Sequence, residues 1–359
     1  YDADATAREI VDLAKPLEGL TRQDSIHAAG VVIGAKPLIE TVPLQQKGSD
    51  QEVVTQFAMG DIEALGLLKI DFLGLRNLDV LEKARELVGN GIDWSTLPLD
   101  DKKVYEMLAK GDATGVFQFE SSGMRDALRL VKPTQFEDLI ALVALYRPGP
   151  MGYIPVYARR KHGQEQATYI DERLKGITSV SHGICIFQEQ YLQIAKQIAG
   201  FTPAEADDLR KAIGKKDHKL MASLKEKFLE GCASSNTTPA VANQLWQDME
   251  ASQDYSFNKS HAACYALIAY RTAYMRAHHP REYMAALISS VMNTKDRVPF
   301  YVNACDEMGI EVLPPDVNHA GRGHGLYVDL GLHGARRPAV REQAGAGVAR
   351  QVRRAGLDR

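Results

Sequence analysis

Hydrophobic and polar positions early in the chain alternate in the pattern of short strands. Residues 67–73 form an apolar run of strand length that only Lys69 and Asp71 interrupt. Side chains two residues apart lie on one face of a strand, so an ammonium and a carboxylate share that face. The pattern alone favours an internal ion pair or an edge strand facing water. The alternative is a metal-binding carboxylate beside a lysine that meets phosphate.

Two further β-branched and apolar stretches, residues 27–33 and 53–57, predict strands in the same sheet as residues 67–73. After Arg76 the hydrophobic period changes from two to about three and a half, which predicts helices. The expected helices cover residues 6–18, 77–88, 101–110, 121–131, 136–146, 188–199, 203–213, 262–277, 281–291 and 298–308, and residues 115–119 are expected to be short and β-like. The fold class is therefore α+β, with a small mixed or antiparallel sheet followed by a mainly helical part.

Composition is that of a globular protein. The chain has 359 residues, of which 45% are hydrophobic, enough for a sizeable core. No apolar run approaches the roughly 18 residues of a membrane span, and no leader opens the chain. We therefore expect a cytoplasmic protein with no membrane partner. The cysteines lie far apart, so neither a zinc site nor a disulfide framework is indicated; they are Cys185, Cys232, Cys264 and Cys305.

The net charge of −3 hides a contrast within the chain. Residues 319–359 hold eight arginines, eight glycines and three acidic residues, and the first 318 residues carry a net charge of −8. Binding to DNA must therefore use local basic patches. The composition of residues 319–359 predicts a disordered tail or an out-of-frame reading of a GC-rich gene; a basic tail that binds single strands is the alternative.

Two basic clusters are candidate contacts for a DNA backbone. Arg147 precedes Pro148-Gly149-Pro150, a rigid turn that ends a helix, and Arg159, Arg160 and Lys161 follow soon after. A basic run is more often a solvated face, but beside this turn it could hold phosphates.

A third group of cations lies at the end of the expected helix 203–213. Arg210, Lys211, Lys215 and Lys216 stand within seven residues. Cations near a helix C-terminus are favoured by the macrodipole alone. The functional alternative is that they bind a triphosphate, whose charge builds up as pyrophosphate leaves.

The segment Phe257-Asn258-Lys259-Ser260-His261 precedes a long helix. Asn258 or Ser260 is a suitable N-cap, and this accounts for the segment without any ligand. Lys259 and His261 are nonetheless candidate nucleotide contacts.

Seven blocks of sequence occur in the order found in a known family. Residues 66–78, with Lys69 and Asp71, resemble the palm motif of the bacterial replicative DNA polymerase III alpha subunits, the C-family DNA polymerases. The other blocks agree with that family up to about residue 318; they lie at residues 27–33, 116–124, 141–150, 187–190, 209–216 and 257–263. The resemblance implies that residues 1–21 end a thumb, 22–76 belong to a palm, 77–318 form fingers and 319–359 lie outside the family pattern.

The resemblance also implies an activity, transfer of deoxynucleotides to a primer 3′-hydroxyl with two magnesium ions (Mg2+). Asp71 would be one of three carboxylates that hold the metals, and Lys69 would meet phosphate. Arg210 and Lys211 would orient the triphosphate, although family members commonly carry arginine where Lys211 stands. The other two carboxylates form an Asp-x-Asp strand expected upstream of this chain, since Asp2-Ala3-Asp4 has no apolar strand around it. The isolated chain is therefore expected to be inactive.

The implied partners are primer–template DNA, deoxynucleoside triphosphates and, through regions outside this chain, a sliding clamp and other replicase subunits. Two alternatives stay open. The chain could be a non-catalytic module that binds nucleotide or DNA, or part of an error-prone repair paralogue of the same family.

Overall fold

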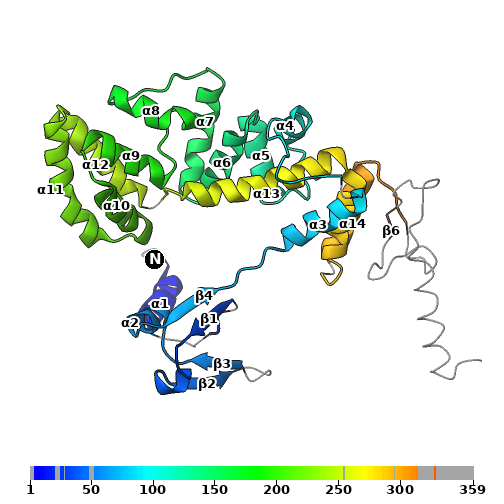
Figure 1. The fold of residues 1–359 in the computed structure, drawn as a ribbon, viewed down its shortest axis with the longest axis horizontal. Helices are drawn as coiled ribbons and strands as arrows, with labels where there is room; N and C mark the ends of the chain where they lie inside the picture. Colours follow the sequence, from blue (N-terminus) through cyan, green and yellow to red (C-terminus); the bar gives the residue numbers. More distant parts are fainter. Residues whose placement is uncertain are drawn as a thin grey trace, which may run out of the picture. The chain divides into compact units, whose positions relative to one another are not determined.

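The computed structural model describes residues 4–20, 25–27, 29–47, 52–89, 91–253, 255–294, 296–313 and 327–328. The chain divides into two compact units, residues 1–75 and residues 76–359 (Figure 1). The first unit contains the strands β1 to β4, and the second contains most of the helices.

The first unit holds two separate antiparallel strand pairs. Strand β1 pairs with β4, and β2 pairs with β3 (Figure 1). The antiparallel sheet predicted from the sequence is confirmed, but the expectation that residues 53–57 share a sheet with residues 67–73 was wrong, because β3 pairs with the neighbouring β2. The elements are α1 (Ala5–Ala14), η1 (Lys15–Leu17), β1 (Gly30–Ile33), η2 (Leu38–Glu40), β2 (Leu44–Lys47), β3 (Glu52–Thr55), α2 (Met59–Ala64) and β4 (Leu68–Asp71).

The register of β1 and β4 separates two faces. Val31 lies opposite Ile70, so these apolar side chains share one face, whereas Gly30 lies opposite Asp71 on the other. Val32 is paired with Lys69 on that second face. The polar residues of β4 therefore gather beside a glycine of β1.

Helix α1 begins where a side chain caps it. The Asp4 carboxylate accepts hydrogen bonds from the backbone N–H groups of Thr6 and Ala7, at 2.9 and 3.2 Å. Pro16 lies in η1, which follows α1 directly, as its effect on a helix predicts. Asp4 is thus part of an exposed helix start, as the sequence predicts, and Asp2 lies outside the described residues.

The second unit is mainly helical, which confirms the change of period after Arg76. The expected helices are present with shifts of up to three residues at their ends, and α7, α8, α11 and α12 were not predicted. The segment 115–119 forms turns rather than the predicted β-like stretch. The helices are α3 (Arg76–Val88), α4 (Lys102–Ala109), α5 (Ser122–Val131), α6 (Phe136–Leu145), η3 (Pro150–Tyr153), α7 (Ile154–Lys161), η4 (Glu172–Leu174), α8 (Lys175–Thr178), η5 (Ser179–Ser181), α9 (Gln188–Ile198), α10 (Pro203–Lys215), α11 (His218–Ser234), α12 (Pro239–Ser252), α13 (Lys259–His278), α14 (Pro280–Ser290) and α15 (Arg297–Glu307).

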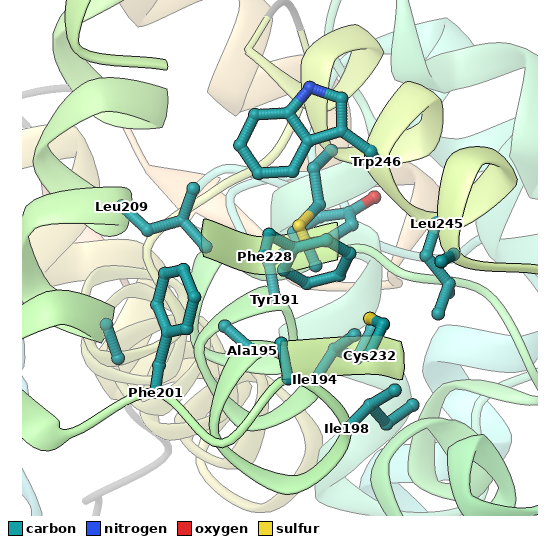
Figure 2. Packing of buried hydrophobic residues seen from close by; sticks show 14 of the residues in the cluster. Tyr191, Ile194, Ala195, Ile198, Phe201, Leu209, Phe228, Cys232, Leu245 and Trp246 are labelled. Carbon is teal, nitrogen blue, oxygen red and sulfur yellow. The ribbon is translucent and has the colours of Figure 1, made fainter. Parts of the chain in front are cut away.

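Two apolar clusters organise this unit. One joins α9, α10, α11 and α12 around Phe228 and Trp246, whose ring centroids lie 5.3 Å apart (Figure 2). The other joins α3, α14 and α15 around residues such as Tyr283 and Cys305. The long helix α13 packs against α3, α4, α6 and α14 (Figure 1). In the part of the chain that the structure describes, no helix combines the length and the apolarity that a membrane crossing needs.

The last described strands are β5 (Val312–Leu313) and β6 (Tyr327–Val328), which pair antiparallel. Apart from β6, the arginine-rich residues 319–359 lie outside the described residues. The predictions of a disordered or out-of-frame tail therefore stay predictions.

Candidate functional site

Three polar side chains meet on one face of the β1–β4 pair. The Lys69 ammonium forms an ion pair and a hydrogen bond with Asp71 Oδ1, and His27 Nδ1 lies 3.6 Å from the same oxygen. Lys69 is the most buried of the three, with 15% of its side chain exposed, while 41% of Asp71 is exposed. The predicted pair of Lys69 and Asp71 is therefore a partly sheltered ion pair that solvent or a ligand can still reach.

Gly30 gives these side chains room to meet. A Cβ at this position would lie 2.9 Å from both His27 Nδ1 and Lys69 Cε, and 3.2 Å from Asp71 Oδ1. Few real Cβ atoms have such close neighbours, so a side chain here would push the three groups apart. The backbone of β1 at Gly30 thus lies directly against the three side chains. Together they line part of a cavity of about 510 Å³ within the first unit.

The hydrogen bond from Lys69 lowers the pKa of Asp71 below its usual range, and the positive charge of Lys69 adds to this effect. A carboxylate that stays ionised is a suitable ligand for Mg2+. Among the described residues, however, no three His, Cys, Asp or Glu side chains gather as a metal site would require. The cluster therefore holds one carboxylate, that of Asp71, beside Lys69 and His27.

In the second unit, segments far apart in sequence meet at the start of α13. Phe187 and Phe257 form an isolated parallel bridge between the residue before α9 and the segment before α13. The Arg147 guanidinium lies 4.2 Å from the centroid of the Phe257 ring and donates to the carbonyl of Tyr255 at 2.7 Å. Burial lowers the pKa of Arg147. The structure therefore uses this arginine to hold two segments together.

A row of rings continues from Phe257 along α13. His261 lies edge-on to Phe257 at 5.4 Å and stacks on Tyr265 at 4.2 Å, and Tyr265 lies 5.3 Å from Phe117. His261 is exposed, and Phe257 and Tyr265 are partly exposed, so these three rings offer faces on which a nucleobase can stack. His261 was expected from the sequence, whereas Tyr265 was not, although its position four residues beyond His261 places it on the same helix face.

Lys259 stands at the first turn of α13. Its backbone N–H donates to Glu189 Oε2 at 2.9 Å, and its ammonium lies 5.6 Å from the Phe187 ring centroid. Asn258 caps the helix, accepting from the His261 N–H at 2.8 Å, and donates to Glu189 at 3.2 Å. The N-cap expected from the sequence is present, and the Lys259 ammonium lies over the Phe187 ring.

Two cations of α10 form ion pairs with acidic residues of the same helix. Arg210 donates to Asp207 Oδ1 at 2.9 Å, and Lys211 lies 3.1 Å from both Asp207 and Asp208. The side chains of these ion pairs are about half exposed, so the pairs are weak and another anion can replace the acidic partners. Lys215 ends α10, and Lys216 follows as its left-handed C-cap with a φ of 53°. A polyanion could compete for the four cations.

The basic residues of α7 are engaged within the protein. Arg159 and Arg160 each donate to Glu165 at 2.9 Å. Lys161 is buried, lies 3.0 Å from Asp138 and donates to the carbonyl of Lys132 at 2.7 Å. This geometry gives Lys161 a structural role and leaves Arg159, whose side chain is about half exposed, as the residue of the three with most surface to offer DNA.

Two family models match the chain. Residues 1–74 match the bacterial DNA polymerase III alpha NTPase domain, and residues 77–236 match the bacterial DNA polymerase III alpha subunit finger domain. The division between these matches falls where the structure divides into two units.

Curated proteins named DNA polymerase III subunit alpha are also similar. The protein from Thermus aquaticus is 48% identical over 331 residues, which cover 89% of this chain and 27% of that protein. The Aquifex aeolicus protein is 45% identical over 88% of the chain and 28% of its own length, and the Escherichia coli protein is 41% identical over 91% and 29%. The chain thus spans little more than a quarter of the relatives it matches. On these matches, which follow the same order as the two units of the structure, the chain belongs to the family of bacterial DNA polymerase III alpha subunits.

Proposed function

We propose that this stretch carries part of the active site of a template-directed DNA polymerase, with Asp71 as one of the metal-binding carboxylates. The observation that carries the proposal is the convergence of Asp71, Lys69 and His27 over Gly30, which keeps an ionised carboxylate within reach of ligands. The relatives from Thermus aquaticus and Aquifex aeolicus are named DNA polymerase III subunit alpha, which supports a role in replication.

Magnesium, when bound, would lower the pKa of a primer hydroxyl and offset the charge of the triphosphate. Asp71 would contribute one oxygen ligand, together with two carboxylates of the longer protein. Lys69 would exchange its ion pair with Asp71 for a phosphate oxygen, so that the positive charge stays beside the reacting groups. Since one carboxylate cannot hold two metal ions, we expect this stretch alone to bind without catalysing.

The second unit would bind the nucleotide and the primer–template DNA. The ring row of Phe257, His261 and Tyr265 offers stacking faces, and the Lys259 ammonium, over the neighbouring Phe187 ring, adds a cation, as recognition of a base and its phosphates requires. Arg210 and Lys211 would exchange Asp207 and Asp208 for the triphosphate. Lys215 and Lys216 would extend this positive surface, and Arg147 would orient the segment before α13.

The nucleotide part of this proposal predicts the behaviour of Arg210→Ala in a full-length polymerase that contains this stretch. Incorporation should slow at least tenfold, and the apparent affinity for the incoming triphosphate should fall, because the guanidinium contact strengthens as charge builds on the leaving phosphates. Single-nucleotide incorporation kinetics measure both quantities.

Arg85→Ala is the matched control, because Arg85 forms the same kind of exposed ion pair with Glu82, three residues away on α3. It should leave incorporation unchanged. If Arg210→Ala behaves like this control, the cations of α10 are solvated surface and do not bind the triphosphate.

A further inference from the structure

The segment before α5 holds a glutamine in a backbone conformation that rarely suits it. Gln118 has a φ of +62°, in the left-handed region. The N–H of Phe119 donates to the carbonyl of Val116 at 3.0 Å, which closes a turn with Gln118 at its third position. Phe117 has no positive φ, so the turn is of type II, and its third position favours glycine or asparagine.

This turn is held by groups from distant parts of the second unit. The N–H of Phe117 donates to Thr272 Oγ1 on α13 at 3.1 Å, and Tyr283 of α14 donates its hydroxyl hydrogen to the carbonyl of Gly115 at 2.6 Å. The N–H of Gly115 in turn donates to Glu120 Oε2 at 3.2 Å. The backbone around Gln118 is therefore fixed by its surroundings.

Gln118 is also the one exposed residue in this segment. Every other residue from 113 to 119 is buried, and the side chain of Gln118 alone is directed to solvent. A position that only had to make the turn would be better filled by glycine, which takes a positive φ without strain. A long polar side chain at an unfavourable φ indicates a contact outside this segment.

The surroundings of Gln118 identify the chemistry of that contact. Gln118 lines a recess of about 210 Å³ together with Arg76, Asn77 and Arg297. Arg76 donates to the carbonyl of Ser290 at 3.2 Å, and Arg297 donates to Glu120 at 3.2 Å. A guanidinium carries five N–H donors, so both arginines keep donors for a ligand. The recess is smaller than the roughly 300–1,000 Å³ of a small-molecule site. Its size therefore suits one nucleotide unit of a DNA strand better than a free ligand.

We propose that Gln118, with Arg76 and Arg297, binds one phosphodiester group of the DNA strand on the polymerase fingers. This proposal rests on the proposed function and adds a positioning residue to it. The Gln118 carboxamide donates a hydrogen bond to a phosphate oxygen, and the two guanidinium groups supply the charge. Phe117, next in the chain, is buried and contacts Tyr265 of the ring row, so the recess lies one residue along the chain from that row.

The test measures binding of a fluorescent primer–template DNA to the 359-residue chain by anisotropy. Gln118→Gly should weaken binding about fivefold, the loss of one hydrogen bond, while the melting temperature stays equal or rises because glycine suits the turn. Gln118→Glu should weaken binding more than tenfold, because a carboxylate repels phosphate. Gln247→Glu, at an exposed position of α12, is the charge-matched control and should bind as the wild type does.

The phosphate that Gln118 contacts is identified by replacing single phosphates of the DNA with neutral methylphosphonates. At one position the replacement should weaken binding of the wild type more than that of Gln118→Gly, since the variant has already lost one of the contacts to that phosphate. The proposal would be overturned if the effects of the phosphate replacement and the Gln118 change are additive at every position. It would also be overturned if both Gln118 variants bind as the wild type does, or if the wild-type chain does not bind the DNA. None of these results bears on nucleotide incorporation by the Arg210 variant, so the two proposals can fail separately.

Discussion

Asp71 and Lys69 share a face of β4 because they are two residues apart, and Gly30 allows them to touch. The sequence was sufficient to predict both the shared face and the ion pair. It did not indicate the part played by Gly30, because the register that places it opposite Asp71 arises from long-range pairing. The 3.6 Å approach of His27 to Asp71 likewise arises from the fold and not from the sequence pattern.

At the residue scale, the Lys69–Asp71 pair predicts how Asp71 titrates. Its pKa in the folded protein lies below the value in the unfolded chain, which is about 3.9. The pair therefore stabilises the fold above pH 4, and this contribution is lost as the pH falls through the lowered pKa. Lys69→Met should return the pKa of Asp71 towards 3.9, as followed by the carboxyl carbon shift in NMR titration.

Lys83→Met is the control for this titration, since Lys83 forms an exposed ion pair with Glu86 on α3. It should leave the titration of Asp71 unchanged. An Asp71 pKa that does not move in Lys69→Met would mean that the two side chains do not pair in solution.

At the scale of elements, most helices were predicted, but α11 and α12 were missed although Asp217 and Thr238 cap them, and the strand pairing was not predicted. Helix α13 follows from its Asn258 cap, and α10 from Thr202 with Pro203. Strand β2 has no apolar alternation, so its pairing with β3 could not be foreseen. The turn at 115–119 looks β-like because Val116 and Phe119 are apolar, but both are buried by α13 and α14 rather than by a sheet.

The packing of α11 on α9 depends on a glycine. A Cβ at Gly231 would lie 1.9 Å from the carbonyl oxygen of Ala199 at the end of α9, and backbone atoms cannot move aside as a side chain can. Gly231→Ala should therefore destabilise the α9–α12 cluster by about 3 kcal/mol, despite the better helix propensity of alanine. Thermal or urea unfolding measures this change.

Gly176→Ala in α8 is the matched control, because no atom lies within 4 Å of a Cβ there. It should be neutral or slightly stabilising. Equal stabilities for the two variants would show that α11 does not approach α9 so closely.

At the scale of the whole molecule, the two units differ in how far they are stabilised by their own cores. Among the described residues of the first unit, Val42 and Ile62 are the buried hydrophobic side chains, whereas the second unit buries extended clusters. The ring row from Phe257 to Phe117 could not be predicted as a whole, because it joins residues 140 positions apart. The family blocks in the sequence contain most of the candidate site residues. The contacts between these residues arise only from the fold.

The central claim, that Asp71 is a metal-binding carboxylate of a polymerase, is tested most directly by primer extension with Asp71→Asn in a full-length polymerase that contains this stretch. The change keeps the shape of the side chain but removes a hard anionic ligand, so extension should fall by several orders of magnitude with unchanged folding. Asp61→Asn, at an exposed position of α2 in the same unit, should extend primers at the wild-type rate. Extension by Asp71→Asn within a few-fold of the wild type would contradict the account and leave Asp71 as the partner of Lys69 alone.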